Sequence, residues 1–123
     1  MIIAVDFDGT CVTHEYPDIG ADIGAQAVLR DLVERGHQLV LHTMRSDVYL
    51  KDAVDWFAKN GIELFGVNHT PGQENWTKSA KCYAHLYIDD AALGVPLAHM
   101  DDLRPFVDWA AVRKLLEEHP LYA

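Results

Sequence analysis

Short apolar runs alternate with amphipathic segments along this chain. The first run, from about Ile2 to Asp6, is apolar on both faces up to its acidic end, which is typical of a buried strand in a parallel sheet. Residues 25–35 then place apolar side chains at helical spacing, and Gly36 is suited to end that helix. The repeated order of strand and helix predicts an α/β fold with a mostly parallel sheet and right-handed crossovers.

The same patterning predicts the remaining elements. Ser46 stands where it can cap a helix that Asn60 and Gly61 would end. We expect a three-layer, Rossmann-like sheet of about five strands, with the first strand central, in a single domain of residues 1–123. The further strands are expected at 37–42, 63–67, 85–88 and, most weakly indicated, 97–99; the further helices are expected at 47–59, 76–84 and 107–119.

Composition places the chain among ordinary soluble globular proteins. Half of the 123 residues are hydrophobic and 24% are charged, and a chain of this length can bury a core without disulfides. Cys11 and Cys82 are far apart and form no CxxC pair, so a thiolate metal site is not expected. Free thiols, and the absence of a signal peptide pattern and of a long apolar run, favour a cytoplasmic protein without a membrane anchor.

The charge balance bears on partners. Ten basic against 19 acidic residues give a formal net charge of −9. A negative surface repels phosphate backbones and anionic lipids, so nucleic acid and membrane surfaces are disfavoured as partners.

Polar side chains follow each expected strand at the point where the strand ends. Because the carboxyl ends of parallel strands share one edge of the sheet, these side chains should converge on one site, which is where open α/β sheets bind ligands. They are Asp6 and Asp8 after the first strand, Thr43 and Arg45 after the second, Asn68 after the third, and Asp89 and Asp90 after the fourth.

Several acidic groups at one edge suit a hard cation such as Mg²⁺, whereas no His/Cys cluster favours Zn²⁺. A carboxylate beside a bound phosphate can act as a nucleophile, and a second carboxyl group can protonate the leaving oxygen and then activate water. A threonine hydroxyl and a lysine, Lys78 or Lys81, can hold the phosphoryl oxygens. Arg45 is a candidate to bind a substrate anion or to face solvent, and Asn68 is a candidate to touch the leaving group or to form a turn.

These motifs resemble those of the haloacid dehalogenase (HAD)-like superfamily. Asp6-Phe7-Asp8-Gly9-Thr10 matches its DxDGT signature, and Leu41-His42-Thr43 is similar to its second motif. Lys81, or alternatively Lys78, matches the third motif, and Tyr87-Ile88-Asp89-Asp90 matches the fourth. The four motifs stand in the family's order and span residues 6–90.

The resemblance implies roles for these residues. Asp6 would be the nucleophile and a Mg²⁺ ligand, and Asp8 the general acid and base, with its backbone carbonyl also on the metal. Thr43 would bind the phosphoryl group and Lys81 would neutralise its charge. Asp89 would ligate Mg²⁺ with help from Asp90, and an aspartate at position 8 marks the phosphatases and phosphotransferases of the superfamily.

The resemblance also implies a member without a cap domain, because residues 11–24 and 68–80 are too short to hold one. An open site would accept a small phosphorylated molecule or an exposed phosphate on a macromolecule, and it leaves room for a homo-oligomer. Lys81 stands closer to Asp89 than is usual between the third and fourth motifs, which leaves the choice between Lys78 and Lys81 open.

The sequence favours a Mg²⁺-dependent phosphohydrolase over three other interpretations. A receiver-like signalling domain uses similar residues, but there the phosphorylated aspartate and the lysine come in a different order. A catalytically weak interaction protein on the same scaffold is disfavoured because each catalytic residue type is present. A phosphatase acting on nucleic acid ends is disfavoured by the net charge of −9.

Overall fold

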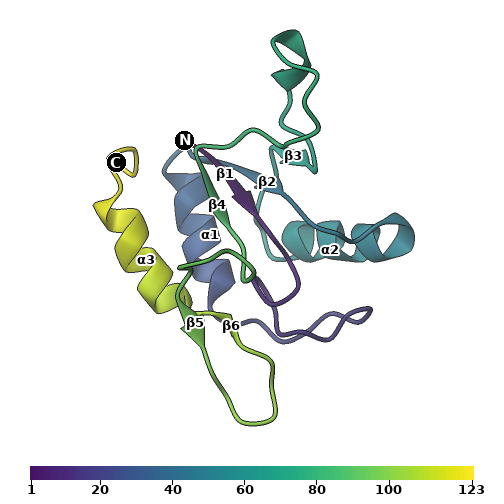
Figure 1. The fold of residues 1–123 in the computed structure, drawn as a ribbon, viewed down its shortest axis with the longest axis vertical. Coiled ribbons are helices and arrows are strands. Elements are labelled where there is room, and N and C mark those ends of the chain that lie inside the picture. Colours follow the sequence, from purple (N-terminus) through teal and green to yellow (C-terminus); the bar gives the residue numbers. More distant parts are fainter.

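The computed structural model describes residues 1–123, and its centre is a four-stranded parallel sheet (Figure 1). The strand order is β3-β2-β1-β4, so the first strand lies inside the sheet, as the sequence predicts. In the register of the sheet, Ile3 of the first strand pairs with Leu39 on one side and with Leu86 on the other. The strands are β1 (Ile2–Val5), β2 (Gln38–Leu41), β3 (Gly66–Val67) and β4 (Leu86–Ile88).

All three α-helices lie on one face of this sheet. Side chains alternate along a strand, so Ile3 and Val5 of β1 point to this face together with Leu39 and Leu41 of β2. They join α1 (Ala25–Glu34), α2 (Asp47–Lys59) and α3 (Trp109–Glu118) in one buried core. The core also contains Phe7, whose ring meets Trp56 edge-on and Phe57 at a tilt, both on α2.

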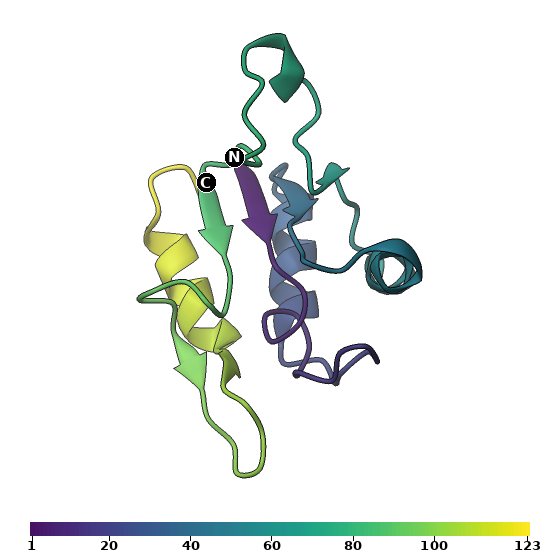
Figure 2. The same ribbon diagram turned by 45° about the vertical axis from the view of Figure 1, so that its right-hand side comes forward.

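The opposite face carries no α-helix, as the view in Figure 2 shows. Its small buried cluster consists of Ala4, Val40 and Cys82, which belongs to the segment between β3 and β4. The right-handed rule explains this arrangement, because the chain moves in one direction from β1 to β3 and must return to β4 across the other face. That return contains only the short 3₁₀ helix η1 (Gln73–Asn75).

The expected α/β fold with a mostly parallel sheet is confirmed, and it is compatible with a Rossmann-like fold, but two details of the expectation, the three layers and the about five strands, differ. The sheet has helices on one face only, and it has four strands. The weakly indicated fifth strand exists as β5 (Leu97–Ala98), but it pairs antiparallel with β6 (Phe106–Val107) in a separate ribbon. The helix expected at 76–84 is absent, and these residues form neither a helix nor a strand.

The other helices match the sequence expectations closely. Gly36 follows α1 with a φ of 91°, and its N–H donates to the Val33 carbonyl, which closes the end of the helix. Ser46 stands at the N-terminus of α2 without a side-chain hydrogen bond there, whereas the Asp108 carboxylate accepts from the N–H of Ala111 at the start of α3. None of the helices combines the length and the apolar character that crossing a membrane requires.

Candidate functional site

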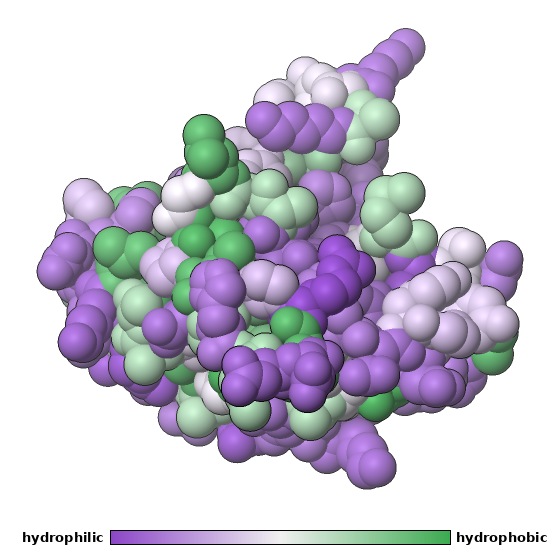
Figure 3. All heavy atoms as spheres, turned by 60° about the horizontal axis from the view of Figure 1, so that its bottom comes forward, coloured by the Kyte–Doolittle hydropathy of each residue, from purple (hydrophilic) through white to green (hydrophobic).

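The four parallel strands have their carboxyl ends at one edge of the sheet, the edge toward which β1 and β4 point downward in Figure 1. Figure 3 looks onto that edge and shows a mostly hydrophilic surface, with hydrophobic groups gathered toward the side of α3 and β5. Asp6 follows β1 directly, and Asp89 and Asp90 follow the adjacent β4 directly. The strand pairing therefore brings together acidic residues that are more than eighty positions apart in the chain.

Asp6, Asp89 and Asp90 form a carboxylate cluster in which oxygen atoms of the three lie within 4.8 Å of one another. The Thr10 hydroxyl donates to Asp6 Oδ2 at 2.9 Å, lies 3.2 Å from Asp90 Oδ1 and accepts from the Asp90 N–H at 3.0 Å. Burial first, and then the charge of Asp89, raise the pKa of Asp6 to about 8. No cationic side chain is among the groups that shift the pKa of Asp6, so the negative charge of the cluster is not fully compensated by neighbouring residues.

This donor set fits a magnesium ion. All of the available side-chain ligands are carboxylate oxygens, which Mg²⁺ prefers, and no histidine or cysteine is part of the group. A divalent cation would also compensate the repulsion that raises the pKa of Asp6. Asp6, Asp89 and Asp90 are the residues that would hold it; the Asp8 carboxylate is not part of this group.

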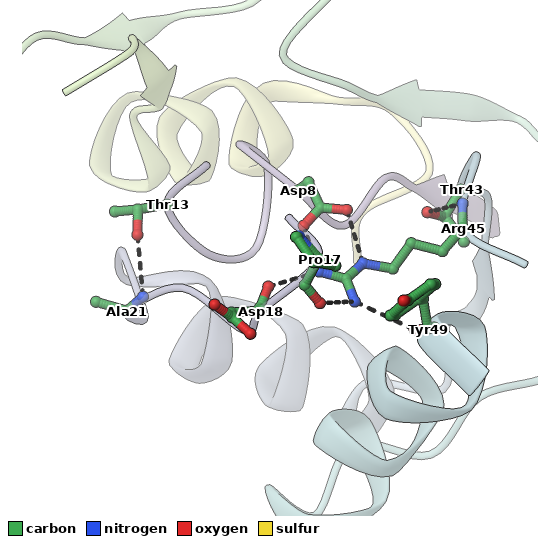
Figure 4. Close-up of polar contacts among 8 residues, drawn as sticks. All are labelled: Asp8, Thr13, Pro17, Asp18, Ala21, Thr43, Arg45 and Tyr49. Atoms are coloured by element: carbon green, nitrogen blue, oxygen red, sulfur yellow. Dashed lines mark hydrogen bonds and ion pairs between the residues drawn. The ribbon is translucent and has the colours of Figure 1, made fainter. Parts of the chain in front are cut away.

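The Asp8 carboxylate is instead bound by Arg45, as Figure 4 shows. Arg45 donates from Nε to Asp8 Oδ2 at 2.8 Å and from Nη2 to Asp8 Oδ1 at 2.7 Å. Its side chain is buried, and it also donates to the carbonyls of Pro17, Asp18 and Tyr49. The pKa of Arg45 is raised, mainly by its hydrogen bonds to Asp8.

Arg45 therefore ties three parts of the chain together: the turn after β1, the loop at 13–21 and the start of α2. The Thr13 hydroxyl accepts from the N–H of Ala21 at 3.0 Å and closes the base of that loop (Figure 4). Of the two alternatives that the sequence leaves for Arg45, a substrate-binding cation or a solvent-facing one, the structure shows neither. Its donors are already occupied inside the protein.

Thr43 and Asn68 lie side by side at the ends of β2 and β3. The Asn68 side-chain oxygen accepts from the Thr43 N–H at 2.8 Å, and Asn68 adopts a left-handed conformation with a φ of 53°. The Thr43 hydroxyl accepts from the Arg45 N–H at 3.1 Å, so its own proton remains free to donate. Asn68 thus positions Thr43, a role closer to the turn-forming alternative than to contact with a leaving group.

Neither candidate lysine reaches the carboxylate cluster. The segment that carries Lys78 and Lys81 rises from the amino ends of the strands, at the opposite end from the carboxyl edge (Figures 1 and 2). Lys81 Nζ lies 5.4 Å from the centroid of the Tyr87 ring, and neither lysine forms an ion pair. No lysine is among the groups that shift the pKa of Asp6.

Two further residues join the site: Thr10, and His14, whose loop position makes it a candidate to contact substrate. Thr10 belongs to the DxDGT motif, and the structure places its hydroxyl between Asp6 and Asp90. His14 Nε2 lies 3.1 Å from Asp90 Oδ2, beside the turn at Gly9. The place of Thr10 in the DxDGT motif is the sequence feature that points to its role in the site. The contact of His14 with Asp90 depends on the path of the loop that carries His14.

Comparison with known proteins gives one informative match. No established family model matches the chain, and no curated protein sequence matches it. A solved structure of a conserved protein from Bacteroides thetaiotaomicron is 35% identical, with a TM-score of 0.80 over 96% of this chain and 90% of that chain. That description names no activity, so it bears on ancestry and fold alone. At this identity and coverage, the chain belongs to the same family as the conserved protein of Bacteroides thetaiotaomicron.

Proposed function

We propose that this protein is a magnesium-dependent phosphomonoesterase that works through an aspartyl-phosphate on Asp6. The observation that carries the proposal is the carboxylate cluster of Asp6, Asp89 and Asp90 at the carboxyl edge of a parallel sheet. Ligand sites of open α/β sheets lie at this edge. Clustered carboxylates are suited to bind Mg²⁺, which in turn binds phosphate oxygens. The DxDGT motif, the strand that ends in Thr43 and the Asp89-Asp90 pair support the same chemistry, whereas the lysine motif does not reach the cluster.

In the first step, an oxygen of Asp6 attacks phosphorus and the bond from phosphorus to the ester oxygen breaks. The leaving oxygen takes a proton and departs as an alcohol. In the second step, water attacks the same phosphorus, the acyl-phosphate bond to Asp6 breaks, and inorganic phosphate leaves. Mg²⁺ bound by Asp6, Asp89 and Asp90 would supply compensating positive charge for the phosphoryl oxygens.

Two side chains are placed to assist these steps. Thr43 can donate its free hydroxyl proton to a phosphoryl oxygen. Asp8, whose two side-chain oxygens accept from Arg45, would accept the proton of the attacking water in the second step. To protonate the leaving oxygen in the first step, Asp8 must carry a proton. This requires that Arg45 release one of the two carboxylate oxygens of Asp8.

The test is hydrolysis of p-nitrophenyl phosphate by the wild type and by Asp6→Asn, each with Mg²⁺ and with EDTA. We expect turnover that needs Mg²⁺ and that falls by at least about a hundredfold in Asp6→Asn, because the nucleophile is lost. Asp101→Asn is the matched control, since Asp101 is an exposed aspartate outside the cluster. Turnover that survives Asp6→Asn would exclude Asp6 as the nucleophile.

A second function, an interaction protein with little or no turnover, is favoured by a separate observation. Both lysines lie away from the cluster, and Asp8 is engaged by Arg45. This alternative predicts that Mg²⁺ binds and stabilises the wild type while no phosphate ester is hydrolysed. Measuring Mg²⁺ binding by calorimetry beside the hydrolysis assay separates the two functions.

A further inference from the structure

The uncovered face of the sheet holds a cavity of about 240 Å³ directly beside Asp6. Its lining combines the carboxylate-bearing Asp6 and Asp89 with two aromatic side chains and four apolar residues: His42, Tyr87, Ala4, Ile88, Ala91 and Ala92. This volume lies below the 300–1,000 Å³ that is typical of pockets for drug-sized ligands, so it suits one small group and not a polymer.

The cavity follows from the fold. Ala4 points to the face that lacks helices, so Asp6, two residues further along, points the same way. In the observed register His42 and Asp89 stand next to Asp6 in the flanking chains, and Tyr87 stands next to Ala4. Because the crossover from β3 to β4 has no α-helix, only a thin segment that includes Cys82 covers Ala4, and a hollow remains beside it toward Asp6.

The wall of this cavity is aromatic and held in place. The Tyr87 hydroxyl donates to the Cys82 carbonyl at 2.6 Å, while the residue remains 38% exposed. The His42 ring centroid lies 6.2 Å from that of Tyr87, and His42 is exposed. A fixed, partly exposed aromatic ring offers a stacking surface to any planar ring, whatever its hydrogen-bonding pattern.

We propose that the substrate is a phosphomonoester whose leaving group carries a planar aromatic ring, which stacks in this cavity against Tyr87 and His42. The inference rests on the proposed phosphatase function, because it places the phosphate at Asp6 and the leaving group along the bare face. Nucleoside monophosphates and aryl phosphates share this chemistry. A nucleic acid chain does not fit it, given the cavity volume and the net charge of −9.

The experiment compares pairs of esters that differ in the ring. Adenosine 5′-monophosphate and ribose 5-phosphate share the same primary ester oxygen, and 2-phenylethyl phosphate against ethyl phosphate forms a second pair in which both leaving groups are primary alcohols. We expect kcat/KM to favour the ring-bearing member of at least one pair by about tenfold or more, as a single stacking contact provides. Calorimetric binding of adenosine and of 2-phenylethanol, which carry no phosphate, gives a readout that does not need turnover.

Variants separate the ring from the rest of the site. Tyr87→Leu should abolish most of the preference, whereas Tyr87→Phe should keep it because the ring remains although the bond to the Cys82 carbonyl is lost. Trp76→Leu is the control, since Trp76 is an exposed aromatic residue outside the cavity. Circular dichroism and thermal unfolding check that each variant folds.

The outcomes distinguish this proposal from the function on which it rests. Turnover that depends on Asp6 but shows no preference in either pair, or a preference that Tyr87→Leu leaves unchanged, would overturn the aromatic site and keep the phosphatase. Adenosine or 2-phenylethanol binding that depends on Tyr87, in a protein without turnover, would keep the aromatic site and overturn the phosphatase.

Discussion

Replacing Arg45 by methionine tests the internal contact that most distinguishes this site. Arg45 is 3% exposed, and its guanidinium donates to both oxygens of Asp8 and to the carbonyls of Pro17, Asp18 and Tyr49. Methionine fills similar space but offers no donor, so these acceptors lose their partner.

The expected cost follows from those contacts. Removing one partner of a buried ion pair typically costs about 3–5 kcal/mol, because the remaining charge is left uncompensated. The Asp8 side chain is 20% exposed and thus in partial contact with water, which places the expected loss in the free energy of unfolding at about 3 kcal/mol, the lower end of that range. Arg45→Lys should recover little of it, because an ammonium group cannot match both carboxylate oxygens and three carbonyls at once.

Urea unfolding monitored by tryptophan fluorescence measures this loss in the wild type, Arg45→Met, Asp8→Asn and the double variant. The cycle should yield a coupling energy of roughly 1–3 kcal/mol between the two side chains, as expected for a directly bonded pair. A loss below about 1 kcal/mol for Arg45→Met, the size of an exposed pair, would refute the reasoning that Arg45 holds this part of the fold together.

Two further predictions concern the carboxylate cluster and the turn beside it. Because the pKa of Asp6 is raised from 3.8 to about 8 in the folded protein, the folded state binds this proton more tightly than the unfolded chain. The contribution of Asp6 to stability in EDTA should therefore be fully present below pH 4 and should be lost as the pH rises to 8. Urea unfolding at pH 5 and pH 8 should show this decline, and Mg²⁺ or Asp6→Asn should diminish it; a decline equally large in Asp6→Asn would assign it to other groups. Gly9→Ala should cost more than Gly36→Ala, because both glycines have a positive φ but only at Gly9 would the added carbon overlap the His14 ring. The shared backbone strain is about 1–2 kcal/mol, and thermal unfolding that shows equal losses for the two variants would contradict the crowding at His14.

The sequence predicted the parts of the fold that depend on local patterning. Apolar runs and helical spacing placed β1, α1 and α2 within a residue or two, because these segments bury one continuous face or stripe. Acidic residues at strand ends likewise predicted that Asp6, Asp89 and Asp90 converge, since parallel strands must present their carboxyl ends at one edge.

Other features were decided only when distant segments packed together. The partner of Asp8 is Arg45, 37 positions away, and this pairing depends on how α2 and the loop at 13–21 surround the guanidinium. The expected fifth strand joined β6 instead of the sheet, a choice between two pairing edges that the strand's own residues do not make.

The face of the sheet without an α-helix is likewise a feature that only tertiary packing decided. A short helix is expected from the sequence at residues 76–84, but an isolated helix of this length needs an apolar stripe packed against a neighbour, and the segment meets the sheet mainly through Cys82. The amino-acid sequence by itself thus determined which chemical groups stand at the ends of the strands. Tertiary packing decided which of them face each other and which face stays open, because both depend on contacts between residues far apart in the chain.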